Sequence, residues 1–155
     1  MIDLQRILVP TDFSKSSENA LRYAVAFVEK FGAQLYLLHV VQDLTWFIPE
    51  AILVAPASIP PAEQFHTAAR TALDRVLAGI TSPGIKTQAD VRQGSPFQAI
   101  VEFAREQNID LIVMGTHGHT GLAHILLGST AERVVRRAPC PVLTVRHPEH
   151  EFVHP

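Results

Sequence analysis

Several features that define particular classes of protein are scarce in this sequence. It has a single cysteine among 155 residues, so no internal disulfide can form, and this fits a reducing compartment. The formal net charge of −2 supplies no basic surface of the kind that nucleic-acid binding requires. No apolar run approaches the ~18 residues of a membrane span, and the first residues do not resemble a signal peptide. We therefore expect a cytoplasmic protein that binds neither nucleic acid nor membrane.

Lysine is also missing from the C-terminal part of the chain, where glycine is concentrated. No lysine follows Lys86, yet residues 115–130 read GTHGHTGLAHILLGST. The absence of a loop lysine excludes the phosphate loop GxxxxGK[ST], and the spacing of Gly115, Gly118 and Gly121 excludes the dinucleotide fingerprint GxGxxG. This loop must therefore bind an anion, if it binds one, without a lysine.

The neighbours of the loop indicate how it could do so. An apolar, strand-like run, residues 109–114, precedes it, and a helix-like segment, residues 131–138, follows it. The start of a helix presents unpaired N–H groups and the positive end of the helix dipole, and glycine lets a phosphate approach the backbone. We predict an anion site formed by backbone N–H groups, Ser129 and Thr130, to which His117, His119 or a metal ion could add charge.

Strands and helices alternate along the rest of the chain. The predicted strands cover residues 7–10, 34–41, 85–92, 109–114 and 142–145, and the predicted helices begin after Ser14, near residue 65, after Ser95 and at residue 131. This alternation predicts an α/β domain over residues 1–147, with an open five-stranded parallel sheet and helices on both faces. Residues 148–155 are predicted to be a disordered tail.

Polar residues at two strand ends predict the strand order. Thr11 and Asp12 follow the first strand, and the glycine loop follows the fourth. Ligands of such sheets bind at the carboxyl ends of the strands, where the strand order reverses. If the first and fourth strands are neighbours, the order is 3-2-1-4-5 and the cleft lies between Asp12 and the glycine loop. The polar-faced third strand then falls at an edge, as its alternating pattern predicts.

The fifth strand has no clearly polar face, because Val142, Leu143 and Val145 occupy both of its sides. An exposed apolar strand at the edge of a sheet promotes association with other chains. Pairing with the same strand of a second copy across a two-fold axis would cover it. We therefore predict a homodimer formed through residues 141–146.

These motifs resemble the nucleotide-binding branch of the universal stress protein family. The family's loop, G-x2-G-x9-G-S/T, matches Gly115, Gly118, Gly128 and Ser129, and residues 7–12 (ILVPTD) and 138–145 (APCPVLTV) resemble the two ends of its domain. The resemblance implies an adenine nucleotide alpha hydrolase-like fold, a homodimer, and binding of ATP, ADP or AMP, with or without Mg²⁺.

The resemblance also implies roles for individual residues. Asp12 would contact the ribose side, the main chain around Val40 and Val41 would meet the adenine, and the loop would hold ribose and phosphates. The predicted nucleotide-binding residues are Pro10, Thr11, Asp12, Val40, Val41, Met114, Gly115, His117, Gly118, His119, Gly128, Ser129 and Thr130. No catalytic or metal-ligating residue is predicted.

Several of these residues also have a simpler interpretation. The glycine loop can be a strand-to-helix turn without a ligand, and Asp12 can be a turn former or helix cap. The histidines at 117, 119 and 124 lie close together, but no nearby acid or cysteine completes a metal-ligand set. His39, inside an apolar strand, is interpreted as a core or strand-end histidine.

Three functions remain open at this stage. The first is a stress-response regulatory protein that binds an adenine nucleotide with at most slow hydrolysis, because a positioned base, a loop lysine and an arginine finger are missing. The second is a genuine ATP hydrolase of the same fold. The third is a nucleotide-free interaction module that uses residues 42–61, where Trp46 and Phe47 would meet a partner. We take the first as the prediction.

Overall fold

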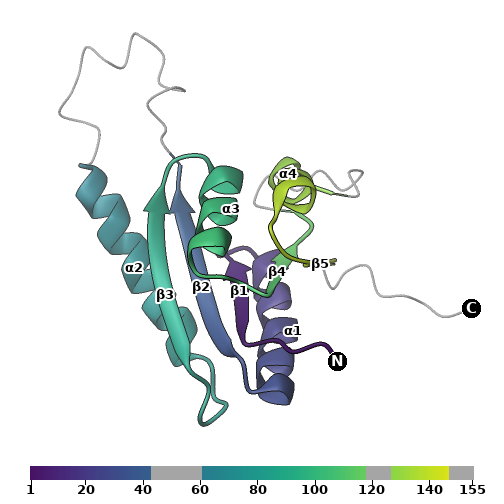
Figure 1. Ribbon diagram of the computed structural model, residues 1–155. Coiled ribbons are helices and arrows are strands. Elements are labelled where there is room, and N and C mark those ends of the chain that lie inside the picture. The colour runs from purple at the N-terminus through teal and green to yellow at the C-terminus, as the bar shows by residue number, and fades with distance from the viewer. Residues whose placement is uncertain (43–60, 118–126, 147–155) are drawn as a thin grey trace, which may run out of the picture.

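A five-stranded parallel sheet forms the centre of the protein. The computed structural model describes residues 1–42, 61–117 and 127–146, and in these residues the strand order is β3-β2-β1-β4-β5. Helices cover both faces of the sheet (Figure 1). The predicted α/β class and strand order are confirmed. The predictions that concern Trp46, Phe47, Gly118, His119, His124 and the tail lie outside the described residues.

The elements alternate as the sequence predicts. The strands are β1 (Arg6–Pro10), β2 (Gln34–Val41), β3 (Thr87–Gln93), β4 (Leu111–Gly115) and β5 (Val142–Val145), and the helices are α1 (Lys15–Phe31), α2 (Ala62–Ala78), α3 (Pro96–Glu106) and α4 (Ser129–Arg137). The bounds of β2 and β5 agree with the prediction. Helix α4 begins two residues earlier than predicted, so its first turn includes both hydroxyl residues at the end of the glycine loop.

The alternation of side chains along the strands divides the core into two layers. Ile7 and Val9 of β1 pack on the face that α1 and α2 cover, whereas Leu8 between them packs on the face of α3 and α4. Phe103 of α3 is fully buried, and its ring centroid lies 6.0 Å from that of Tyr36. The helical pattern of the sequence did not indicate this residue as part of the core. Both faces of the sheet are therefore buried, as expected of a parallel sheet.

The two edge strands differ in how their surface is covered. On the β3 side, the guanidinium of Arg92 forms an ion pair with Glu106 at 2.6 Å and lies over the ring of Phe103. This contact lowers the pKa of Glu106, chiefly through the hydrogen bond from Arg92. On the β5 side, Val142 and Leu143 are only partly buried. The apolar edge predicted from the sequence is thus present in the fold.

The helix starts and stops follow local signals in part. Ser14 caps α1 as predicted, and Gly32 ends it in the left-handed conformation at φ 68°. Ser95 precedes α3 as predicted, but its side chain makes no capping hydrogen bond.

At the amino ends of the strands, the Asp110 carboxylate accepts hydrogen bonds from the backbone N–H groups of Gln5 and Arg6. This contact joins the start of β1 to the start of β4.

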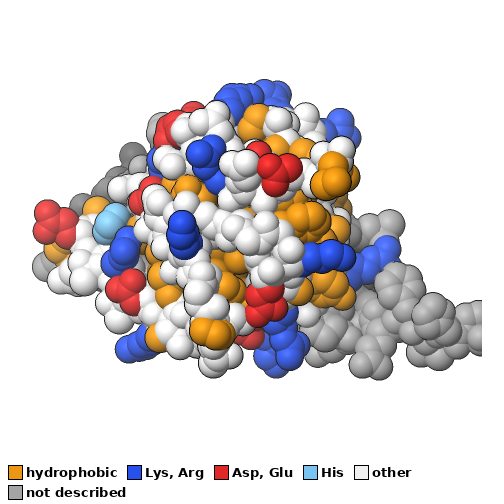
Figure 2. Space-filling view, turned by 60° about the horizontal axis from the view of Figure 1, so that its bottom comes forward, with side chains coloured by type: hydrophobic (Ala, Val, Ile, Leu, Met, Phe, Trp, Pro, Cys, Tyr) orange, Lys and Arg blue, Asp and Glu red, His pale blue; other side chains and the backbone are white. Residues whose placement is uncertain are grey.

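The exposed surface carries charges of both signs. On the face that Figure 2 shows, Lys and Arg side chains are interspersed with Asp and Glu and with small apolar areas. Among the helices of the described residues, none combines the length and the apolar character needed to cross a membrane.

Candidate functional site

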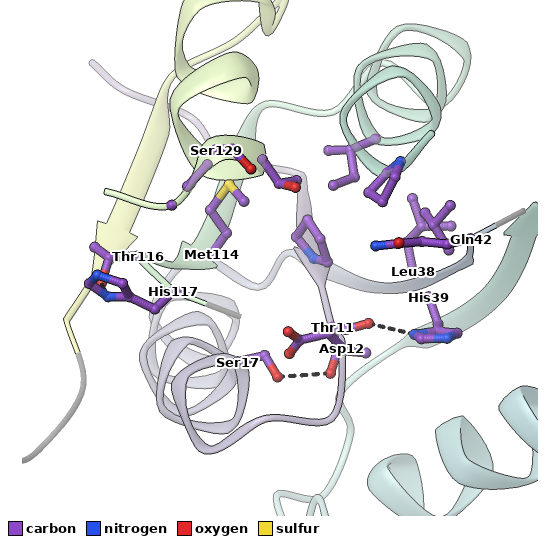
Figure 3. Close-up of a pocket in the computed structure, with 18 residues that line it drawn as sticks. Thr11, Asp12, Ser17, Leu38, His39, Gln42, Met114, Thr116, His117 and Ser129 are labelled. Atoms are coloured by element: carbon purple, nitrogen blue, oxygen red, sulfur yellow. Dashed lines mark hydrogen bonds between the residues drawn. The ribbon is translucent and has the colours of Figure 1, made fainter. Parts of the chain in front are cut away.

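A cavity of about 310 Å³ lies at the carboxyl ends of β1, β2 and β4 (Figure 3). It is found where the strand order reverses, between β1 and β4, as expected of a ligand site in an open α/β sheet. The first turns of α1, α3 and α4 complete its walls. Its volume falls in the range of about 300–1,000 Å³ that small-molecule sites occupy.

Most of the predicted site residues line this cavity. They are Pro10, Thr11, Asp12, Val40, Met114, Gly115, His117, Gly128, Ser129 and Thr130. Val41 is not among the lining residues, because its side chain packs on the opposite layer and its carbonyl accepts a hydrogen bond from the Gly94 N–H at 2.9 Å. The structure therefore brings Asp12 and the end of the glycine loop together but leaves Val41 out of the cavity.

The start of α1 forms one side of the cavity and is capped by its own side chains. The Ser14 hydroxyl accepts a hydrogen bond from the Ser17 N–H at 3.2 Å, and Asp12 Oδ1 accepts one from the Ser14 N–H at 3.0 Å. The acid Glu18 lies in the first turn. Asp12 is thus a turn former and also a residue of the cavity wall, so the simpler interpretation and the ligand interpretation do not exclude each other.

The start of α4 forms the opposite side and has no side-chain cap. Gly128 occupies the cap position, and its N–H donates to the Thr116 carbonyl at 2.6 Å. The backbone N–H groups of Ser129, Thr130 and Ala131 belong to the first turn, where an α-helix offers no internal acceptor. All three residues line the cavity. The first-turn acid of this helix, Glu132, forms an ion pair with Arg136 at 3.0 Å.

The charges around the cavity favour an anion held by the backbone. Among the described residues that line it, none is a lysine or an arginine, and Asp12 is the one carboxylate. A phosphate would repel Asp12, so it would lie against α4, where N–H donors and the positive end of the helix dipole are found.

The two glycines of the cavity wall have packing reasons to be glycine. A Cβ atom on Gly115 would lie 2.2 Å from Ser16 Oγ and 2.9 Å from the Ser16 carbonyl carbon. A Cβ on Gly128 would lie 3.0 Å from the Thr116 carbonyl oxygen. Gly115 therefore allows α1 to sit against the end of β4, a role that the glycine spacing alone did not indicate.

Histidines occupy two positions in the cavity wall. His117 Nδ1 lies 2.9 Å from Thr116 Oγ1, and His39 Nδ1 lies 2.8 Å from the Thr11 carbonyl oxygen. His39 is a strand-end histidine, as predicted, but it also lines the cavity. The described residues contain no cluster of three or more His, Cys, Asp or Glu side chains that could hold a metal ion.

The remaining lining residues were not predicted. They are Ser17, Leu38, His39, Gln42, Pro96, Ile100, Thr116 and Ala131. Pro96 and Ile100 belong to the first turns of α3 and add to an apolar wall that includes Leu38 and Val40. The sequence predicts where α3 begins, but it does not predict that this helix lies next to the end of β2.

Cys140 is not in the cavity wall. Burial raises the pKa of its thiol to about 11, which keeps the sulfur protonated.

Comparison with known proteins gives a consistent result. The model of the universal stress protein family matches residues 3–146. Universal stress protein MJ0531 of Methanocaldococcus jannaschii is 40% identical over 148 residues, which cover 95% of this chain and 85% of the relative. The structure of MJ0577 from the same organism is 31% identical with a TM-score of 0.76 and covers 94% of this chain and 97% of that one. A universal stress protein in complex with cAMP is 29% identical with a TM-score of 0.62 and covers 94% of this chain and 99% of that one.

Proposed function

This chain belongs to the universal stress protein family, and from this premise we propose that it is a cytoplasmic, stress-response regulatory protein that binds ATP or another adenine nucleotide in the cavity between β1 and β4. One observation carries the proposal. The uncapped first turn of α4 faces the same cavity as Asp12, at the point where the strand order reverses. A relative that binds cAMP supports an adenine nucleotide as the ligand class.

The chemistry of the walls suggests how the nucleotide lies. The phosphates bind the N–H groups and hydroxyls of Ser129 and Thr130, where the helix dipole is favourable. Asp12 accepts hydrogen bonds from the ribose hydroxyls, because a carboxylate is repelled by phosphate but pairs with a donor. The base lies on the apolar wall around Val40, Pro96 and Ile100. A divalent cation that accompanies the phosphates would find one carboxylate, Asp12, among the described lining residues.

We also propose that the protein hydrolyses ATP slowly, if at all. Efficient phosphoryl transfer needs cations on the transferred group and a positioned base. The described lining residues supply neither lysine nor arginine, and Asp12 already accepts a hydrogen bond within its own turn. We expect a turnover below about 0.1 per second, against roughly 1–1,000 per second for typical enzymes. A faster rate would favour the ATP hydrolase alternative.

We further propose that β5 pairs with its counterpart in a second copy. The carbonyls of Pro141 and Val145 accept hydrogen bonds from Ile112 in β4 and from Thr116 directly after it, so alternation points the N–H of Thr144 away from β4 and toward the open edge. Thr144→Pro removes that outward donor without removing a bond to β4. The wild-type protein should elute as a dimer at micromolar concentration and this variant as a 17.1 kDa monomer. A monomeric wild type would end the proposal.

Calorimetric titration with ATP, ADP and AMP tests the nucleotide site directly. Ser129 is the first helical residue of α4, and Gly128 before it has ψ 159°, so Ser129→Pro removes one backbone N–H while the helix can still form. Ser129→Ala is the matched control, since it removes the hydroxyl and keeps the N–H.

The two variants should differ in affinity. A hydrogen bond to a charged group contributes about 1.5–3 kcal/mol, so Ser129→Pro should weaken ATP binding by roughly tenfold or more and Ser129→Ala by less. Equal effects of the two substitutions would show that the phosphates do not use this N–H. If the wild-type protein binds none of the three nucleotides, the interaction-module alternative is favoured.

A further inference from the structure

The turn that carries Asp12 has an unusual backbone. Phe13, the next residue, adopts φ 63°, in the left-handed region that bulky side chains rarely enter. Residues in such conformations persist only where their surroundings hold them, and they concentrate at binding sites. The contacts that hold Phe13 should therefore also fix the direction of the neighbouring Asp12 side chain.

One side chain, His39 at the end of β2, contacts both neighbours of Asp12. Its Nδ1 lies 2.8 Å from the carbonyl oxygen of Thr11, and its ring lies 4.6 Å from the ring of Phe13, at an interplanar angle of 35°. A carbonyl oxygen only accepts hydrogen bonds, so Nδ1 carries the proton and donates. His39 thus restrains the peptide group that precedes Asp12 and the side chain that follows it.

A second set of contacts closes the turn from the other side. Thr11 Oγ1 accepts a hydrogen bond from the Phe13 N–H at 3.0 Å and lies 3.1 Å from Ser17 Oγ in α1. The Thr11 N–H donates to the Leu38 carbonyl of β2 at 2.8 Å. The turn is therefore tied to β2 through His39 and Leu38 and to α1 through Ser17.

Figure 3 shows how this arrangement relates to the cavity. His39 lies on one side of the backbone at Thr11 and Asp12, and the Asp12 carboxylate extends on the other side. His39 can therefore influence the carboxylate by fixing the backbone between them.

We propose that His39 is a positioning residue that holds Asp12 in the orientation needed to bind the ribose hydroxyls of the nucleotide. The proposal rests on the proposed nucleotide-binding function and adds a source of sugar selectivity to it. Asp12 would recognise the 2′- and 3′-hydroxyls of the ribose, because these groups donate hydrogen bonds to a carboxylate. Selectivity then depends on a histidine that lies on the other side of the backbone from the Asp12 carboxylate.

The test compares binding of ATP with binding of 2′,3′-dideoxy-ATP, so that the measured quantity is a ratio of two dissociation constants. The wild-type protein should prefer ATP by about tenfold or more, given the strength of hydrogen bonds to a carboxylate. His39→Phe keeps a ring against Phe13 and removes the donor, and it should bring the ratio close to one. His39→Asn places an amide N–H where Nδ1 was and should retain most of the preference.

Two further variants separate positioning from a general loss of stability. Asp12→Asn keeps an oxygen to accept the Ser14 N–H but loses the charge, and it should abolish the preference. In the Asp12→Asn background, His39→Phe should change the ratio no further. Leu73 lies on the buried face of α2 and outside the cavity wall, so Leu73→Ala should lower the stability of the fold and leave the ratio as in the wild type.

Phe13→Gly provides a second probe should His39→Phe fail to fold. It removes the ring that His39 contacts, and glycine tolerates φ 63°, so the turn can relax and the preference should fall.

The outcomes distinguish this proposal from the proposed function. A wild-type protein that does not bind ATP contradicts the function itself. A wild-type protein that binds ATP and 2′,3′-dideoxy-ATP equally overturns the positioning role and leaves nucleotide binding in place. The positioning role is also overturned if His39→Phe, or Phe13→Gly in its place, keeps the wild-type ratio. The same holds if His39→Phe changes the ratio as much in the Asp12→Asn background as in the wild type.

Discussion

Two helices, α1 and α4, begin at the same cavity but begin in different ways. The start of α1 is capped by its own chain, since the Ser14 hydroxyl accepts a hydrogen bond from the Ser17 N–H and Asp12 accepts one from the Ser14 N–H. The start of α4 has Gly128 at the cap position and therefore no capping side chain. Hydrogen bonds that are complete within the chain stabilise the fold, whereas N–H donors without an internal acceptor are available to a ligand. We infer that the α1 side shapes the cavity and that the α4 side binds the anion.

The largest expected effect concerns the packing of α1 on β4. Gly115→Ala places a Cβ atom 2.2 Å from Ser16 Oγ, so α1 must move, and we expect a loss of about 3 kcal/mol in the free energy of unfolding. Urea denaturation measures this loss. Gly79→Ala is the control, because a Cβ there meets ordinary contacts of 3.4 Å and longer. Equal stability of the two variants would contradict the close packing of α1.

The next effect concerns the left-handed residue on the α1 side. Phe13→Gly and Phe13→Ala both remove the aromatic ring, but alanine keeps a Cβ at φ 63° and glycine does not. A Cβ in the left-handed conformation costs roughly 1–2 kcal/mol. The glycine variant should therefore unfold at higher urea concentration than the alanine variant. A more stable alanine variant would mean that the turn does not keep this conformation in solution.

A smaller effect should separate stability from affinity. Ser14→Ala removes the α1 cap and should lower the free energy of unfolding by about 1 kcal/mol. Its ATP dissociation constant should stay within about twofold of the wild type, since the anion is not held by α1. Ser129→Pro should behave in the opposite way, with weaker binding and little change in stability. If Ser14→Ala weakens ATP binding as strongly as Ser129→Pro, the two helix starts do not differ in the way we infer.

The smallest expected effect is a matched substitution at the start of α1. Lys15 is the first helical residue of α1, as Ser129 is of α4, and Ser14 before it has ψ 161°. Lys15→Pro should therefore be accommodated, with a change in stability within about 0.5 kcal/mol and no change in ATP affinity. Calorimetry on Lys15→Pro and Ser129→Pro side by side makes the comparison. A loss of ATP affinity in Lys15→Pro would place part of the anion on α1.

Local patterns in the sequence were sufficient for the elements and for the location of the cavity. Apolar runs predicted β2 and β5 with their observed bounds, and the polar ends of the first and fourth strands predicted the strand order. They placed Asp12 opposite the end of the glycine loop, and both line one cavity. Such features depend on a few neighbouring residues, so periodicity and turn chemistry reveal them.

Contacts between distant segments could not be predicted in this way. The need for glycine at 115 arises from Ser16, almost a hundred residues away in sequence, and the apolar wall receives Pro96 from a helix on the opposite face from α1. Val41, which the resemblance places at the adenine, is not among the residues that line the cavity, and its carbonyl accepts a hydrogen bond from the Gly94 N–H. The left-handed Phe13 has no local signal either, because glycine or asparagine is the residue expected there.

The hydrogen bond from the Gly128 N–H to the Thr116 carbonyl, at 2.6 Å, also bears on how the loop can change in length. It joins the residue that follows β4 to the residue that caps α4, so the two ends of the intervening segment are held at a constant separation. Adding residues to a segment with fixed ends costs only its closure entropy, about 0.6 kcal/mol for each doubling of length. We therefore expect insertions between 118 and 126 to leave β4 and α4 in place on either side.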